Sequence, residues 1–193
     1  MKYQERDIFT LPNILTLYRL FLAPILYLTL AEGMRGLALF IFLLSGASDI
    51  ADGFLARYLN EVSDFGKIID PIADKVTYFL VLLGLLPDVP LLVILLIALA
   101  IKEGISLISS LIFLAHSTHI QGARMHGKIT GALLWSTVFL HLLSPALPDV
   151  FTIVSLSLTL TSMSISFVLY IKEHLCSVPR ASRNIAEDFI RRL

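Results

Sequence analysis

The chain has 193 residues, 15 basic and 15 acidic side chains, no formal net charge and 56% hydrophobic residues. This apolar content is too high for an ordinary soluble domain, and the balanced charge gives no support to nucleic-acid binding. The single cysteine excludes an intramolecular disulfide framework and a thiolate metal cluster. The composition therefore predicts a helical membrane protein.

The predicted elements are apolar stretches long enough to cross a bilayer, which takes about 20 residues of helix. Backbone groups in lipid must hydrogen-bond within their own segment, so these stretches are expected to be helices. Turn signals such as Glu32-Gly33 and the proline-containing run 87–90 separate them. The predicted spans are 13–31, 37–57, 67–86, 89–115, 126–144 and 149–171.

The two ends of the chain are more polar than the region between them. Residues 1–12 mix charged side chains with Ile, Phe and Leu, as amphipathic juxtamembrane segments do, and a solvated chain end is the alternative. No internal repeat or linker divides the chain. We therefore predict one all-α, polytopic membrane domain over 1–193, with a six-helix core at 13–171 and a cytoplasmic tail at 172–193.

Positive charge predicts the orientation, because Lys and Arg collect in cytoplasmic loops. An even number of spans puts both termini on one side, and the loops of the opposite side offer only Arg35. The side of the termini holds Lys2, Arg6, Arg57, Lys67, Arg124, Lys128, Lys172, Arg180, Arg183, Arg191 and Arg192. Both termini and the polar stretch 48–76 are therefore expected to face the cytoplasm, at the cell membrane if the source is bacterial.

Four aspartates stand out in this polar stretch. Asp49 and Asp52 are three residues apart and Asp70 and Asp74 are four apart, so each pair shares one face of a helix. If the second and third spans form an antiparallel hairpin, the four carboxylates converge. Their repulsion is relieved only by protonation or by cations. Hard divalent cations take oxygen ligands, so the set predicts a two-metal site for Mg²⁺ or Mn²⁺.

Small residues and an arginine accompany the aspartates. Gly53 and Ala56 fall on the face of the first pair and Gly66 on the face of the second, which leaves bare backbone where a flat ligand could lie close. Arg57 offers a forked donor to phosphate oxygens. Together they indicate a nucleotide diphosphate bound through metal. The alternative is that the aspartates cap helices and the glycines ease helix packing.

These residues form the pattern D-x2-D-G-x2-A-R-x8-G-x3-D-x3-D without a gap or substitution. The residues that match it are Asp49, Asp52, Gly53, Ala56, Arg57, Gly66, Asp70 and Asp74. In this pattern the chain resembles the CDP-alcohol phosphatidyltransferase family.

The resemblance implies an enzyme in which CDP-diacylglycerol, or another CDP-alcohol, gives its phosphatidyl group to a hydroxyl and releases CMP. By position, Asp49, Asp52, Asp70 and Asp74 would bind two divalent cations, Mg²⁺ or Mn²⁺, and Asp74 would also act as the catalytic general base. Gly53, Ala56, Arg57 and Gly66 would be the CDP-binding positions. The resemblance also implies a homodimer.

The acceptor is less well defined. "LPNILTLYRLFLAP" at 11–24 and "DPIADKV" at 70–76 resemble the phosphatidylglycerophosphate synthase branch, whose acceptor is glycerol 3-phosphate. Cardiolipin synthases, which use phosphatidylglycerol, share much of both stretches, and inositol phosphate, serine or choline-type acceptors remain open. Asn13, Thr16 and Arg19 in the first stretch would lie near the nucleotide, or else cap the helix and extend to the membrane interface.

Three basic residues are candidates for binding the acceptor. Lys102, next to Glu103, stands where the branch has Arg-Glu, and the alternative is a pair that holds neighbouring helices. Arg124 and Lys128 lie near a partial match to a basic element of the branch, and they read equally well as positive-inside anchors.

A divalent-cation transporter is a distant alternative, because carboxylates in a membrane also bind translocated ions. Arg57 beside the aspartates would repel such a cation.

Overall fold

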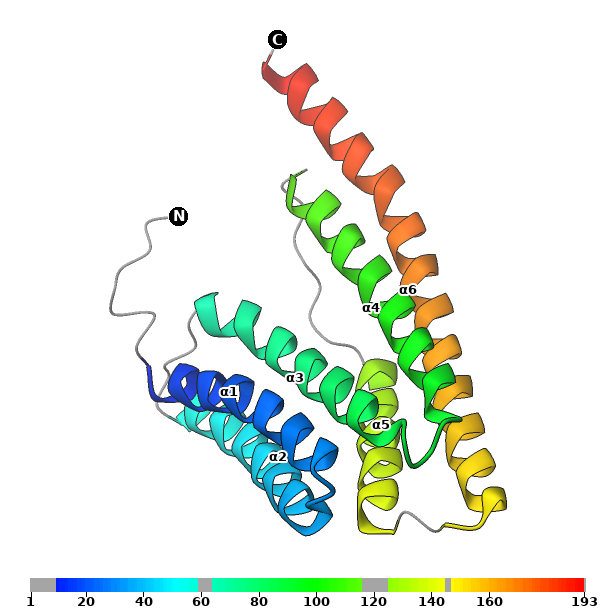
Figure 1. Cartoon of the computed structure of the whole chain (residues 1–193). Helices are drawn as coiled ribbons and strands as arrows, with labels where there is room; N and C mark the ends of the chain where they lie inside the picture. The colour runs from blue at the N-terminus through cyan, green and yellow to red at the C-terminus, as the bar shows by residue number, and fades with distance from the viewer. Residues whose placement is uncertain (1–9, 59–63, 116–124, 145–146, 193) are drawn as a thin grey trace. The chain divides into compact units, whose positions relative to one another are not determined.

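Figure 1 shows the computed structural model of the chain, which describes residues 10–58, 64–115, 125–144 and 147–192. Throughout these ranges the protein contains helices and no strand. The helices are α1 (Leu11–Ala31), α2 (Arg35–Tyr58), α3 (Asp64–Leu85), α4 (Leu92–Ala115), α5 (Met125–Leu143) and α6 (Asp149–Arg192). The all-α expectation is thus confirmed for the described residues. Each helix begins within three residues of the start of the corresponding predicted stretch.

Two of these helices carry segments long and apolar enough to cross a membrane, Asn13–Ala31 in α1 and Asp149–Lys172 in α6. A shorter apolar segment, Gly127–Leu143, forms most of α5. These segments fit a membrane protein, and the arrangement with six spans stays a prediction. Most of the predicted amphipathic segment, residues 1–9, lies outside the described residues.

Local signals account for the bounds of α1. Thr10 is its N-cap, and Thr10 Oγ1 accepts a hydrogen bond from the Asn13 backbone N–H at 3.5 Å. At the other end Gly33 adopts φ +74°, a left-handed conformation that glycine enters without steric cost. The Met34 N–H returns to the Thr29 carbonyl at 2.8 Å, which closes the helix end. The resulting turn is short, so α2 runs back antiparallel to α1 (Figure 1).

The chain forms two compact units, and the first contains residues Met1–Leu99 and Val138–Leu147. Within it α1 packs against both α2 and α3, and α3 runs in the same direction as α1 (Figure 1). α1 and α3 approach each other closely at Gly84, where an added Cβ would lie 2.8 Å from Leu30 Cδ1 and 3.0 Å from Leu30 Cβ. A side chain at this position would therefore force Leu30 or its helix to shift. The buried apolar side chains of these three helices are Leu22, Ala23, Leu26, Leu30, Ala38, Ile41, Phe42, Ala73, Val81, Leu82 and Leu85.

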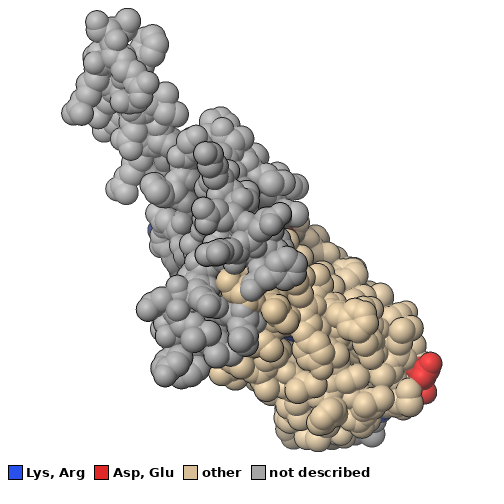
Figure 2. All heavy atoms as spheres, turned by 90° about the vertical axis from the view of Figure 1, so that its left-hand side faces the viewer, with Lys and Arg blue, Asp and Glu red and all other residues tan. Residues whose placement is uncertain are grey.

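The outer surface of this unit is apolar as well. Phe21, Phe40 and Ile50 are all largely exposed, and in the face drawn in Figure 2 almost every described atom belongs to an uncharged residue. A soluble monomer rarely exposes apolar side chains over so broad an area. The surface is that expected of helices in contact with lipid.

The second unit contains Ala100–Thr137 and Pro148–Leu193, and hydroxyl groups join its helices. Thr130 Oγ1 of α5 lies 2.9 Å from Ser162 Oγ of α6, and Thr137 Oγ1 lies 2.8 Å from Thr159 Oγ1. Tyr170 of α6 donates a hydrogen bond to the Ser106 carbonyl of α4 at 3.3 Å. Hydroxyl pairs of this kind join helices where apolar contact alone gives no preference over lipid.

The last helix is longer than the predicted span. The apolar stretch ends near residue 171, yet α6 continues to Arg192 through the segment predicted as a tail. The described side chains of α6 end at Lys172.

Candidate active site

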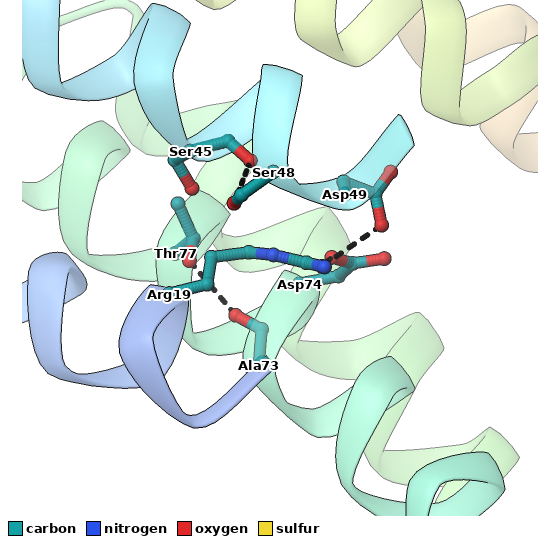
Figure 3. A network of polar contacts seen from close by, with 7 residues as sticks. All are labelled: Arg19, Ser45, Ser48, Asp49, Ala73, Asp74 and Thr77. Atoms are coloured by element: carbon teal, nitrogen blue, oxygen red, sulfur yellow. Dashed lines mark hydrogen bonds and ion pairs between the residues drawn. The ribbon is translucent and has the colours of Figure 1, made fainter. Parts of the chain in front are cut away.

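Two of the predicted site aspartates meet at a buried arginine. Arg19 Nη1 of α1 lies 2.9 Å from Asp49 Oδ1 of α2, and the same nitrogen donates a hydrogen bond to Asp74 Oδ1 of α3. Figure 3 shows the guanidinium end between the two carboxylates. Three helices therefore contribute to one ionic cluster, which we call the Arg19 cluster (Arg19, Asp49 and Asp74).

Exposure differs sharply within the Arg19 cluster. The Arg19 side chain is 2% exposed, whereas those of Asp49 and Asp74 are 47% and 40% exposed. A charge buried to this extent is costly unless it is paired and hydrogen-bonded, and here two carboxylates pair with it. The cation thus lies on the protein side, while both carboxylates remain accessible from outside.

Neighbouring hydroxyl groups are satisfied by their own helices. Ser48 Oγ donates to the Ser45 carbonyl at 2.7 Å on α2, and Thr77 Oγ1 donates to the Ala73 carbonyl at 2.8 Å on α3 (Figure 3). Ser48 and Ala73 directly precede the two aspartates along the chain. These bonds keep the two buried hydroxyls paired without a carboxylate.

Arg19 belongs to a polar stripe on α1. Asn13, Thr16 and Arg19 follow one another at intervals of three residues, and all three side chains are buried. The alternative in which Arg19 extends to the membrane interface is therefore wrong, because its guanidinium lies inside the protein against two carboxylates. Asn13 is not the helix cap, a position that Thr10 occupies.

The other predicted residues of the aspartate pattern lie on the same two helices. Asp52, Gly53, Ala56 and Arg57 fall within α2, and Gly66 and Asp70 within α3. Their side chains lie outside the described residues. The helical repeat places Asp52 and Asp70 about one turn from Asp49 and Asp74. The structure thus brings together the first and last aspartates of the pattern, and the positions of the two between them stay a prediction.

The family model for CDP-alcohol phosphatidyltransferase matches residues 9–171. The chain belongs to the CDP-alcohol phosphatidyltransferase family. This assignment confirms the resemblance expected from the aspartate pattern, and the matched range contains every helix that contributes to the Arg19 cluster.

The relatives that the chain resembles include proteins of two names. The CDP-diacylglycerol--glycerol-3-phosphate 3-phosphatidyltransferase of Aquifex aeolicus is 49% identical over 75 residues, which cover 38% of this chain and 41% of that protein. The protein of the same name from Rickettsia felis is 34% identical over 117 residues, 59% of this chain and 57% of the relative. The cardiolipin synthase (CMP-forming) of Rattus norvegicus is 48% identical over 69 residues, 35% of this chain and 22% of the relative. The chain thus spans less than two thirds of each relative's length.

The carboxylates of the Arg19 cluster are suitable ligands for the divalent cations that membership of the CDP-alcohol phosphatidyltransferase family implies. Carboxylate oxygens are the ligands that Mg²⁺ and Mn²⁺ prefer, and both Asp49 and Asp74 are accessible. Among the residues whose side chains are described, no group of three His, Cys, Asp or Glu residues is placed to hold a metal ion. The side chains of Asp52 and Asp70 are not described. Asp49 and Asp74 therefore fit the predicted metal site by their chemistry, and the contribution of the other two aspartates stays a prediction.

The candidates for acceptor binding in this family member belong to the second unit. Lys102 Nζ lies 2.6 Å from Glu103 Oε1, and both side chains are about four-fifths buried. The contact joins neighbours on α4, so the positive charge of Lys102 is balanced within its own helix. Lys128 on α5 is exposed, and Arg124 lies outside the described residues.

Proposed function

We propose that this family member transfers the phosphatidyl group of CDP-diacylglycerol to glycerol 3-phosphate and releases CMP, as a phosphatidylglycerophosphate synthase. The observation that carries the proposal is the meeting of Asp49 and Asp74, from two helices, at one buried cation. A pattern that only capped helices would not need its first and last carboxylates at one point. A site that binds bridging cations does.

The four aspartates Asp49, Asp52, Asp70 and Asp74 are proposed to hold two divalent cations, Mg²⁺ or Mn²⁺. When bound, these would neutralise the diphosphate of the CDP-alcohol and favour the departure of CMP.

The residues between the aspartates are proposed to bind CDP. Gly53, Ala56 and Gly66 would leave room for the nucleotide close to the backbone, and Arg57 would donate two parallel hydrogen bonds to phosphate oxygens.

Asp74 is proposed to act as the general base. Its side chain is 40% exposed, so a hydroxyl of the acceptor can reach it. Asp74 takes the hydroxyl proton while the acceptor oxygen bonds to the phosphorus of the phosphatidyl group. The bond from that phosphorus to the oxygen of CMP breaks, and CMP leaves with the bonding pair.

Lys102, Arg124 and Lys128 are proposed to meet the phosphate of glycerol 3-phosphate. The pairing of Lys102 with Glu103 reduces the positive charge available for this dianion. That reduction favours a second candidate, cardiolipin synthase, whose acceptor is phosphatidylglycerol and whose name the rat relative bears.

Purified protein tests these alternatives when it is given CDP-diacylglycerol with Mg²⁺ or Mn²⁺. CMP release is expected with glycerol 3-phosphate and is compared with phosphatidylglycerol, inositol phosphate, serine and choline-type alcohols. Release with phosphatidylglycerol alone would establish the second candidate. No release with any acceptor, together with Mn²⁺ flux into liposomes, would overturn the transferase and favour a cation transporter.

We also propose that the chain is one domain over 1–193 that crosses the membrane six times, with both termini and the aspartates on the cytoplasmic side, and that it forms a homodimer. The single cysteine, Cys176, lies in the proposed cytoplasmic tail. A maleimide that does not cross membranes should label it in inverted vesicles and not in right-side-out vesicles, and the reverse result would contradict the orientation. Light scattering of the purified protein tests the dimer.

A further inference from the structure

Arg19 approaches two carboxylates from the inside of the protein. Its guanidinium is almost completely buried, whereas Asp49 and Asp74 are each more than a third exposed. The same atom, Nη1, contacts Oδ1 of both carboxylates (Figure 3). One cation thus attracts two like charges that come from two different helices.

Two carboxylates held close together repel each other, and the repulsion grows as water is excluded. Either protonation or a nearby cation relieves it. The arginine guanidinium keeps its charge at every pH at which proteins fold, so its effect does not depend on a ligand. A divalent cation that binds from the exposed side relieves the same repulsion. The effects of Arg19 and of a bound metal on stability should therefore overlap.

We propose that Arg19 is the resident counter-ion of this site, a positioning residue that holds Asp49 and Asp74 together when no divalent cation is bound. The inference rests on the proposed function in one respect, which is that these carboxylates bind divalent cations. A resident cation also repels an incoming one. Arg19 therefore stabilises the metal-free protein and lowers its affinity for the metal.

Melting temperatures of the full-length protein in detergent, measured in EDTA and in saturating Mn²⁺, test the first half of the inference. Arg19→Gln is expected to lower the melting temperature in EDTA by about 5–10 °C, because it removes the cation that both carboxylates contact. Saturating Mn²⁺ should remove most of this deficit. A deficit of the same size in EDTA and in Mn²⁺ would overturn the inference.

The matched control is Arg35→Gln, which removes the ion pair between Arg35 and Asp88 in the same unit. Any loss of melting temperature in this variant is expected to be the same in EDTA and in Mn²⁺. If Mn²⁺ restores Arg35→Gln as fully as Arg19→Gln, the metal acts on the protein in general and the inference fails.

Direct titration with Mn²⁺, followed by electron paramagnetic resonance of the free ion, tests the second half. A ligand that stabilises a variant more strongly than the wild type binds its native state more tightly. Arg19→Gln is therefore expected to bind Mn²⁺ roughly 10- to 100-fold more tightly than the wild type, because a repelling charge has gone. Arg35→Gln should bind it unchanged. Equal or weaker binding by Arg19→Gln would show that Arg19 does not oppose the metal.

Two further variants keep the inference testable if Arg19→Gln does not fold in EDTA. Arg19→Lys retains the charge and should lose less of the melting temperature than Arg19→Gln. Arg19→Gln combined with Asp49→Asn removes the cation and one of the two carboxylates. This double variant should recover about half of the loss in EDTA. A double variant as unstable as Arg19→Gln alone would assign Arg19 to packing and overturn the counter-ion role.

CMP release by the wild type separates this inference from the proposed function. Mn²⁺-dependent release together with an Arg19→Gln deficit that Mn²⁺ does not change would overturn the inference alone. If Mn²⁺ removes the deficit but none of the offered acceptors leads to CMP release, the result would support the inference and overturn the proposed transferase.

Discussion

Two arginines in the first unit form ionic contacts that differ in charge balance. Arg35 Nη2 at the start of α2 lies 2.5 Å from Asp88 Oδ2, just beyond α3, and the two side chains are 27% and 36% exposed. Arg19 is buried and faces both Asp49 and Asp74. The Arg35 pair contains one basic and one acidic side chain, whereas the Arg19 cluster contains one basic and two acidic side chains.

The difference indicates what each pair does. A balanced and partly exposed pair needs nothing further, and pairs of this kind contribute little to stability. An unbalanced cluster with accessible carboxylates still attracts a cation after its arginine is in place. Asp88 also neutralises Arg35, the basic residue that the charge rule assigned to the outer side. Of these two ionic groups, the Arg19 cluster is the one that contains more acidic than basic side chains.

Removal of divalent cations should give the largest effect, and it should act on the proposed site aspartates and not on the Arg35–Asp88 pair. We expect EDTA to abolish CMP release, because carboxylates without their metals repel the diphosphate. Added Mg²⁺ or Mn²⁺ should restore it, measured as CMP produced from CDP-diacylglycerol. Full activity in EDTA would remove the metal part of the proposed function.

Substitution of the general base should give the next largest effect. Asp74→Asn keeps the shape of the side chain but does not accept the proton, so CMP release should fall by about 10³-fold or more. Asp88→Asn makes the same chemical change in the Arg35 pair and should leave CMP release within about twofold of the wild type, since this pair touches no proposed site residue. Similar losses in both variants, each shown to be folded by size-exclusion chromatography, would erase the contrast between the two pairs.

Packing between α1 and α3 should affect the free energy of unfolding and not the stabilisation by Mn²⁺. Gly84→Ala places a Cβ against Leu30 and is expected to cost about 1–3 kcal/mol of unfolding free energy, because the Leu30 side chain or its helix must shift. Thermal or denaturant unfolding in EDTA and in Mn²⁺ should show the same loss. A loss that only Mn²⁺ removes would mean that the spacing of these helices controls the Arg19 cluster.

The smallest effect is expected from the balanced pair itself. Arg35→Gln should cost no more than about 1 kcal/mol of unfolding free energy, since the pair is partly exposed. Chemical denaturation measures this value. A cost several times larger would show that the two pairs contribute alike to stability.

Much of the fold was predictable because its signals are local. Apolar runs bounded by turns such as Glu32-Gly33 placed the helices, and the spacing of the aspartates singled out Asp49 and Asp74, which meet at Arg19. Arg19 was harder, because spacing along one helix shows which face a residue occupies and not which residue it meets on another helix. The intervals between Asn13, Thr16 and Arg19 did indicate a shared polar face. That this face turns inward against α2 and α3 follows from tertiary packing, which no short pattern records.

The extension of α6 was missed for a different reason. The apolar stretch stops near residue 171, and the segment that follows is polar enough to read as a solvated tail. A helix needs no apolar face to continue beyond a packed segment, because propagation costs far less than nucleation. Hydropathy therefore marked the end of the proposed span and not the end of the helix, which is Arg192.

The position of Arg19 on the first helix also bears on how the protein is made. Chains are synthesised from the N-terminus, so α1 emerges before α2 and α3. In the proposed membrane setting, the cation that faces Asp49 and Asp74 is already present when each aspartate arrives. An acidic helix end that enters the bilayer beside an existing positive charge is less costly to insert than one that enters alone. The order of the helices along the chain thus favours the biogenesis of the site.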